Sequence, residues 1–88
     1  MEEARNEYAE ALQIRRELAE KNPKTYRPDV AATLNNLGVL DSHQGRLEEA
    51  RQEYVEALQI YEALSKQNPE RFSHDVERVE ELLEKLPN

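Results

Sequence analysis

The side chains best suited to acid–base chemistry or metal binding in this chain are its two histidines and nineteen carboxylates. His43 and His74 fall on different predicted helices, and neither belongs to a cluster of ligands at helical spacing, so both are expected to lie on the surface. Carboxylates such as Glu80 and Glu81 are adjacent in the sequence, which points them to different parts of a helix surface. No Gly-rich phosphate loop and no nucleophile motif is present. The sequence therefore predicts no enzyme, no catalytic residue, no metal site and no cofactor.

Net charge and composition narrow the possible partners. The charge is −7, and most of the acidic excess follows residue 46. An acidic chain without a basic stripe repels phosphate, so neither nucleic acid nor an anionic membrane surface is an expected partner. A basic partner would be drawn to the C-terminal half, although the acidic excess can equally be a solvated helix surface. The chain has no cysteine and no apolar run near the roughly 20 residues of a membrane span, which favours a soluble, cytoplasmic protein.

Helices must position any functional side chain in this sequence. Apolar residues recur three or four positions apart within segments rich in good helix formers, which gives each segment one buried face. Short connections between such segments make consecutive helices antiparallel. The expected fold class is therefore an all-α, antiparallel helix-turn-helix array of about four helices. The predicted helices cover residues 2–21, 28–43, 47–67 and, approximately, 74–85.

Proline, glycine and serine mark the predicted helix boundaries. Asn22-Pro23 and Asn68-Pro69 are expected to stop the first and third helices, because the residue before proline is driven out of the helical region. Pro28 suits the first turn of the second helix, which leaves residues 24–27 as a short connection. Gly45 is the expected left-handed cap after the second helix, and Ser73 is the expected N-cap of the fourth.

An internal repeat organises the chain. Residues 48–60 repeat residues 2–14 with only two differences, Asn6/Gln52 and Ala9/Val55. The two segments are 46 residues apart, and the same register relates the two Asn-Pro pairs. Self-similarity at a fixed period of about 20–50 residues marks stacked repeat proteins, in which each unit buries its apolar face against its neighbours. The sequence therefore predicts a helical repeat array.

A pattern of large and small residues at fixed spacing resembles that of the tetratricopeptide repeat: Leu34, Leu37, Gly38, Gly45, Ala50, Tyr54 and Ala57. The glycine and alanines within the helices are small enough for two helices to approach closely, and the leucines and the tyrosine fill the space beside them. The period of 46 residues exceeds the usual period of about 34, so the chain looks most like the extended repeat of kinesin light chains. This resemblance implies a fragment of an α-solenoid that binds other proteins.

The resemblance also implies how the single domain, residues 1–88, divides. Residues 2–21 would be the second helix of a partial repeat, and residues 28–67 would be one complete helix-turn-helix repeat. Residues 73–86 would be a C-terminal capping helix with a polar outer face, as solenoids require. Asp41 stands where the family usually has an aromatic residue, so the core beside Asp41 is expected to be either thin or exposed.

The peptide-binding surface implied by the resemblance is the second helix, because the corresponding helices line the groove of related proteins. An amide at the position of Asn36 can hold a peptide backbone, since it both donates and accepts hydrogen bonds. The alternative is that the asparagines bond a neighbouring helix or face water. A single such helix supplies too few basic residues for tight binding of a carboxylate tail. Besides Ala32, the expected surface residues are Asn35, Asn36, Val39, Ser42 and His43.

The first helix lacks a preceding helix to cover one of its sides. About three repeats are normally needed for a stable array, so this apolar side is a candidate for self-association, with a possible homodimer as the product. The other possibility is that the chain is the C-terminal piece of a longer array. The residues expected in a self-association contact are Tyr8, Leu12 and Leu18. The sequence does not identify the partner protein or the oligomeric state.

Overall fold

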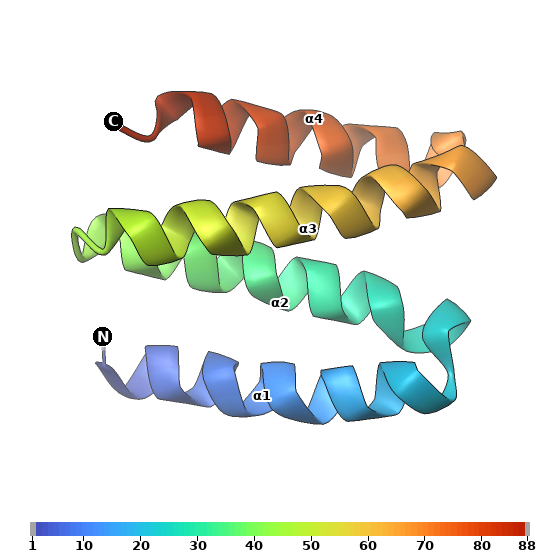
Figure 1. Ribbon diagram of the computed structural model, residues 1–88, viewed down its shortest axis with the longest axis horizontal. Coiled ribbons are helices and arrows are strands. Elements are labelled where there is room, and N and C mark those ends of the chain that lie inside the picture. The colour runs from blue at the N-terminus through green and yellow to red at the C-terminus, as the bar shows by residue number, and fades with distance from the viewer. Residues whose placement is uncertain (1, 88) are drawn as a thin grey trace.

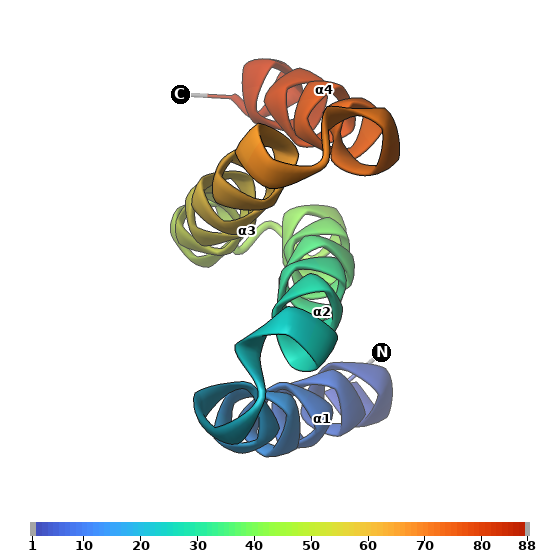
Figure 2. The ribbon, with the colours of Figure 1, turned by 90° about the vertical axis from the view of Figure 1, so that its right-hand side faces the viewer.

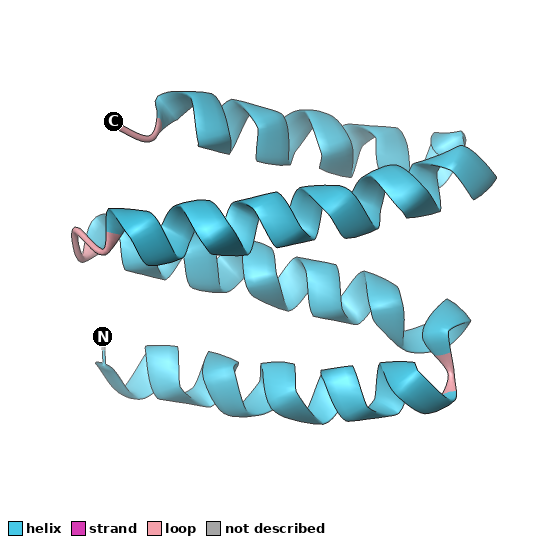
Figure 3. Ribbon diagram, viewed as in Figure 1, coloured by secondary structure: helices cyan, strands magenta, loops and turns pink. Residues whose placement is uncertain are grey.

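The computed structural model describes residues 2–87 as four helices that follow one another in an array (Figure 1). The helices are α1 (Glu2–Lys21), α2 (Pro23–His43), α3 (Leu47–Gln67) and α4 (Pro69–Lys85). Each helix packs against the next one in the chain and runs in the opposite direction. Figure 3 shows only helices and short loops within residues 2–87. The all-α, antiparallel array predicted from the sequence is confirmed.

The helices zigzag between two sides of the array. In Figure 2, which looks along the helices, α3 stands on one side, and α2 and α4 stand on the other. Of the two central helices, α2 packs between α1 and α3, and α3 packs between α2 and α4. As a result, α1 has a neighbouring helix on one side only within residues 2–87.

Two helices begin earlier than predicted. α2 begins at Pro23 instead of Pro28, and α4 begins at Pro69 instead of after Ser73. The preceding asparagines, Asn22 and Asn68, leave the helical region with φ −143° and −144°. A proline directly after such a residue is preorganised for the first helical position, where its missing N–H costs nothing. Each Asn-Pro pair therefore ends one helix and starts the next, and a single residue makes each connection.

The two residues predicted to start helices lie inside them. Pro28 is an internal proline of α2, and the predicted connection over residues 24–27 is the first turn of that helix. Figure 1 shows this turn displaced from the line of the rest of α2, as expected where proline removes a hydrogen bond of the helix. Ser73 does not cap α4: its hydroxyl donates to Pro69 O one turn back, over 2.5 Å. The N-cap is Asn68, whose side chain accepts from Arg71 N.

The core lies along the contact between α2 and α3 and continues to α4. Leu34, Tyr54 and Val79 are almost completely buried. Gly38 allows the close approach of α2 to α3, because a Cβ at this position would lie only 2.6 Å from Tyr54 Cε1, whereas non-bonded carbons need about 3.5 Å. Gly45 has φ 78° and makes the left-handed turn between α2 and α3. The structural roles predicted for both glycines are confirmed.

The outer surface of α4 is acidic. Phe72 and Val79 face the core, and the Phe72 ring lies 6.3 Å from that of Tyr61 on α3. Glu77, Glu80, Glu81 and Glu84 are exposed. A helix with one apolar and one charged side is suited to the end of a stack, since its outer side remains in water.

Candidate interaction surfaces

The predicted peptide-binding residues of α2 differ in their exposure. Asn36, His43 and the neighbouring Ala32 are exposed, while Asn35, Val39 and Ser42 are half-buried. Residues three or four positions apart lie on the same side of a helix. The accessible part of this surface is therefore the row formed by Ala32, Asn36 and His43, with Val39 at its base.

Hydrogen bonds separate the free side chains on α2 from those with a structural role. Ser42 Oγ donates to Val39 O over 2.9 Å within the helix, and Val39 packs against the core. Asn35 Oδ1 is buried and accepts no hydrogen bond within residues 2–87. The amide of Asn36 is exposed and forms no side-chain hydrogen bond with the described part of the chain. Of the two asparagines, Asn36 is the one available to a partner.

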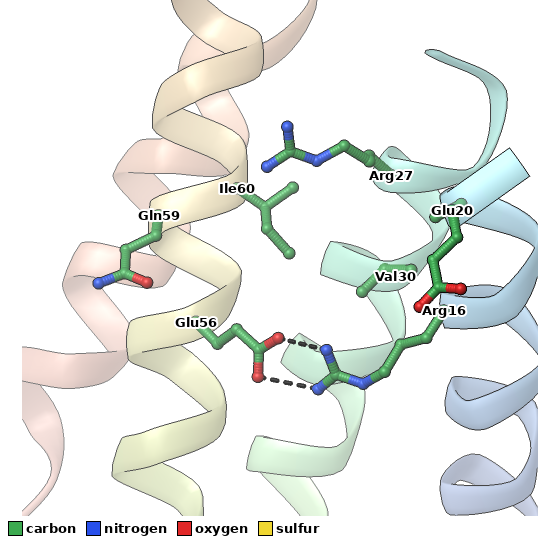
Figure 4. Close-up of a pocket in the computed structure, with 8 residues that line it drawn as sticks. Arg16, Glu20, Arg27, Val30, Glu56, Gln59 and Ile60 are labelled. Carbon is green, nitrogen blue, oxygen red and sulfur yellow. Dashed lines mark hydrogen bonds and ion pairs between the residues drawn. The ribbon is translucent and has the colours of Figure 1, made fainter. Parts of the chain in front are cut away.

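A hollow of about 460 Å³ is lined by residues of α1, α2 and α3 (Figure 4). Val30 and Ile60 contribute its apolar lining. Arg16 closes one side by donating two hydrogen bonds to Glu56, of 2.5 and 2.8 Å, and this contact lowers the pKa of Glu56. Figure 4 shows the Arg27 guanidinium on the side of the hollow away from that ion pair. Sequence reasoning missed this hollow, because Arg16 and Glu56 belong to no common motif and come together only through the fold.

Two further hollows, of about 330 and 300 Å³, lie along α1. The first is lined by α1 alone, on its uncovered side, and the second is lined also by Tyr26 and Asp29 of α2. Tyr8 lines the first and Leu18 lines the second, with Ala11 and Arg15 shared between them. Leu18 is 36% exposed. Leu12, the third residue predicted for self-association, instead packs against the core. The structure therefore places Tyr8 and Leu18 on the uncovered side of α1 and places Leu12 away from it.

A buried ion pair joins α1 to α2. Asp41 is fully buried, and Arg5 Nε donates to its Oδ1 over 2.6 Å. The prediction that the core beside Asp41 could be exposed is wrong, because Asp41 is fully buried and its charge is neutralised by the Arg5 guanidinium. The contact recurs one repeat later: Arg51, 46 residues after Arg5, donates to Pro87 O, 46 residues after Asp41, over 3.0 Å.

A second carboxyl group belongs to this buried cluster. Although burial alone would raise the pKa of Asp41, its hydrogen bond with Arg5 holds that pKa below its ordinary value. Burial, followed by the hydrogen bond and the charge of Asp41, raises the pKa of Glu53 to about 8. The remaining charges that face Glu53 are those of Arg5 on α1 and Glu49 on α3. At neutral pH Glu53 therefore keeps its proton, while Asp41 is ionised beside Arg5.

This cluster makes stability depend on pH. The pKa of Glu53 is raised on folding from 4.5 to about 8, so the folded chain keeps a proton that the unfolded chain loses. Its contribution is complete below pH 4.5 and is lost as the pH rises towards about 8. The contribution of Asp41 to stability has the opposite dependence on pH. Because folding lowers the pKa of Asp41, this contribution is present above its ordinary pKa and is lost only in strong acid.

We expect the urea midpoint to fall between pH 5 and pH 8.5, and Glu53→Gln to flatten this decline. The same substitution at the exposed Glu10 is the control, and an equal decline in all three proteins would contradict the assignment.

Within residues 2–87, no group of three or more His, Cys, Asp or Glu residues is arranged to hold a metal ion. No helix in this part of the chain combines the length and the apolar character that crossing a membrane requires.

Comparison with known proteins gives one match. Residues 30–70 match the family model described as Tetratricopeptide repeat. The matched segment contains most of α2, all of α3 and the first residues of α4, so it includes both the Gly38–Tyr54 contact and the exposed row on α2. No curated protein and no solved structure matches the chain significantly.

Proposed function

We propose that the chain holds a peptide or helix of another protein on the exposed row of α2, because residues 30–70 match the tetratricopeptide repeat family. Repeats of this family are non-enzymatic scaffolds that mediate protein–protein interactions. We further propose that the repeat has the extended, kinesin-light-chain-like form.

The observation that carries this proposal is the free amide of Asn36 in the middle of α2. Its side chain is exposed and has no hydrogen-bond partner within residues 2–87. An amide offers two donors and one acceptor oxygen, which match the alternating groups of a peptide backbone. Ala32, on the same side of the helix, is small and leaves room beside the amide for a bound chain.

Charge indicates the kind of partner. The chain carries a net charge of −7, and five glutamates are exposed on α4, which lies on the same side of α3 as α2 does. A neutral or basic peptide would be attracted to this surface, whereas a phosphorylated or acidic one would be repelled. The proposed partner is accordingly a protein segment with a positive or neutral net charge.

Self-association is a second candidate function, and the uncovered side of α1 favours it. A hollow lined by α1 alone lies on this side, and Ile14 and Leu18 remain 57% and 36% exposed. A second copy of the chain could cover these residues and form a homodimer. Such a dimer would leave the exposed row of α2 free, so the two functions are compatible.

A peptide display screen tests the main proposal. We expect selected peptides to bind Asn36→Ala about fivefold to tenfold more weakly than the wild type, because one to two hydrogen bonds are lost. Asn6→Ala is the matched control, since Asn6 is an exposed asparagine on α1. Circular dichroism of both variants should be unchanged. Peptides that bind all three proteins equally would show that α2 is not the binding surface. Light scattering over a range of concentrations, on the same samples, measures self-association directly.

A further inference from the structure

The internal repeat places the residues of the uncovered side of α1 a second time in α3, where another helix covers them. Ala50, Tyr54 and Ala57 of α3 are 46 residues after Ala4, Tyr8 and Ala11 of α1, and the residue types are identical. In α3 these side chains are 0–1% exposed. In α1 the corresponding three are only half-buried and line the 330 Å³ hollow. The same surface therefore occurs twice in the chain, once covered and once open.

The covered copy shows what kind of helix fits this surface. Tyr54 lies against Gly38 of α2, so closely that a Cβ there would come within 2.6 Å of the tyrosine ring. Leu34, one turn before Gly38, and Leu37, directly before it, are buried. A helix with a glycine at the point of closest approach and leucines directly before it and one turn before it is thus complementary to an Ala-Tyr-Ala row.

We infer that the open side of α1 is a docking site for an amphipathic helix of another polypeptide that carries the pattern of α2. The glycine of this helix would lie against Tyr8, and the leucines that correspond to Leu34 and Leu37 would pack beside it. This site is on a different surface from the exposed row of α2, and it does not rest on the peptide binding proposed for that row.

Arg15 marks the limit of the open surface. The position of Tyr61 on α3 is taken by Arg15 on α1, and Arg15 lines both hollows. The second hollow is also lined by Asp29 of α2, so an acidic residue of this chain already shares that hollow with Arg15. The proposed docking site is therefore the first hollow, which is lined by residues of α1 alone.

The last helix of the chain itself does not meet these requirements. In the repeat register, Glu80 and Glu84 of α4 correspond to Leu34 and Gly38 of α2, and both glutamates are exposed. Stacking α4 of one copy on α1 of another would press Glu84 against Tyr8 and bury two carboxylates without partners, which is costly. Copies of this chain are therefore not expected to stack end to end through α4, and the occupant that we infer is a different helix. A homodimer that pairs α1 with α1 is the alternative that the experiment below distinguishes.

A peptide with the sequence of α2, Pro23–His43, is the probe for this site. We expect the fluorescently labelled peptide to bind the wild-type protein, as measured by anisotropy. Ala11→Glu should weaken binding about tenfold or more, because it buries a charge in the contact. Ala9→Glu is the matched control, since Ala9 is exposed and outside the open side. A peptide carrying Gly38→Leu should not bind.

Three outcomes would overturn the inference: no binding by the wild type, equal binding by the Ala11 and Ala9 variants, or equal binding of the Gly38→Leu peptide. If Ala11→Glu disturbs folding by circular dichroism, Ala4→Glu provides the same test, because Ala4 lines the same hollow. A wild-type dimer that Ala11→Glu dissociates would show that a second copy occupies the site, which also contradicts the inference. Asn36→Ala should leave binding of this peptide unchanged. The docking site on α1 and the peptide-binding row on α2 can therefore be disproved separately.

Discussion

Replacing Gly38 by valine is expected to lower the free energy of unfolding by about 3 kcal/mol, the upper end of the range for overpacking a core. The new Cβ would lie 2.6 and 2.8 Å from two carbon atoms of the Tyr54 ring. That ring is 1% exposed, so it cannot move aside without displacing other core side chains. A loss of this size is a large share of the total stability of a domain of this length. Urea denaturation followed by circular dichroism measures it.

The exposed position Ala32 on the same helix provides the control. Ala32→Val introduces the same side chain into α2 without a core contact, so only the lower helix propensity of valine should appear, about 0.6 kcal/mol. Gly38→Val, by contrast, gains slightly in helix propensity, and any loss there comes from the contact with Tyr54. If the two variants lost the same stability, the close approach of α2 to α3 would not be what requires glycine.

The contact of Gly38 with Tyr54 is also the part of the core that the sequence predicted best. Residues of fixed size at fixed spacing, such as Gly38, Ala50 and Ala57, carry the information locally, and the repeat shows it twice. The number of helices and the ends of α1 and α3 followed from the same local signals. The starts of α2 and α4 did not, because a proline that ends one helix is equally suited to begin the next, and only the backbone of Asn22 and Asn68 decides between them.

Contacts between distant side chains could not be predicted in the same way. Arg5 and Asp41 are 36 residues apart, and Arg16 and Glu56 are 40 apart. Neither pair forms a motif. A charged residue at a position that the family fills with an aromatic was a visible signal at Asp41, but the sequence could not name the arginine that neutralises it. The candidate binding residues were predictable only as positions on a helix, and burial then separated Asn36 from Asn35 and Ser42.

Replacing Arg5 by methionine is expected to cost about 3 kcal/mol of stability. Breaking a buried ion pair on one side leaves an uncompensated charge, which costs roughly 3–5 kcal/mol. We expect the lower end, because the Arg5 side chain is 22% exposed and partly screened by water, while that of Asp41 is fully buried. Methionine keeps most of the packing of the arginine stem, so the change isolates the charge. Urea denaturation at pH 7 measures the loss.

Arg16→Met is the matched control. The Arg16–Glu56 pair has hydrogen bonds of 2.5 and 2.8 Å, shorter than the 2.6 and 3.4 Å of the Arg5–Asp41 pair, but its side chains are 44% and 38% exposed. Exposed pairs contribute about 0–1 kcal/mol, so this variant should lose little. The comparison separates the effect of burial from that of hydrogen-bond geometry, because the pair with the shorter hydrogen bonds is the one in contact with water.

The double variant Arg5→Met/Asp41→Leu decides whether the ion pair itself is favourable or whether only its disruption is costly. Buried ion pairs replaced by apolar residues of similar size are often neutral or better, so the double variant should recover most of the stability that Arg5→Met loses. It should also lower the pKa of Glu53, since the charge and hydrogen bond of Asp41, which help to raise that pKa to about 8, are gone. The fall in stability between pH 5 and pH 8.5 would then become smaller. A double variant as unstable as Arg5→Met, with an unchanged pH profile, would show that Asp41 is not the group that couples the two helices to Glu53.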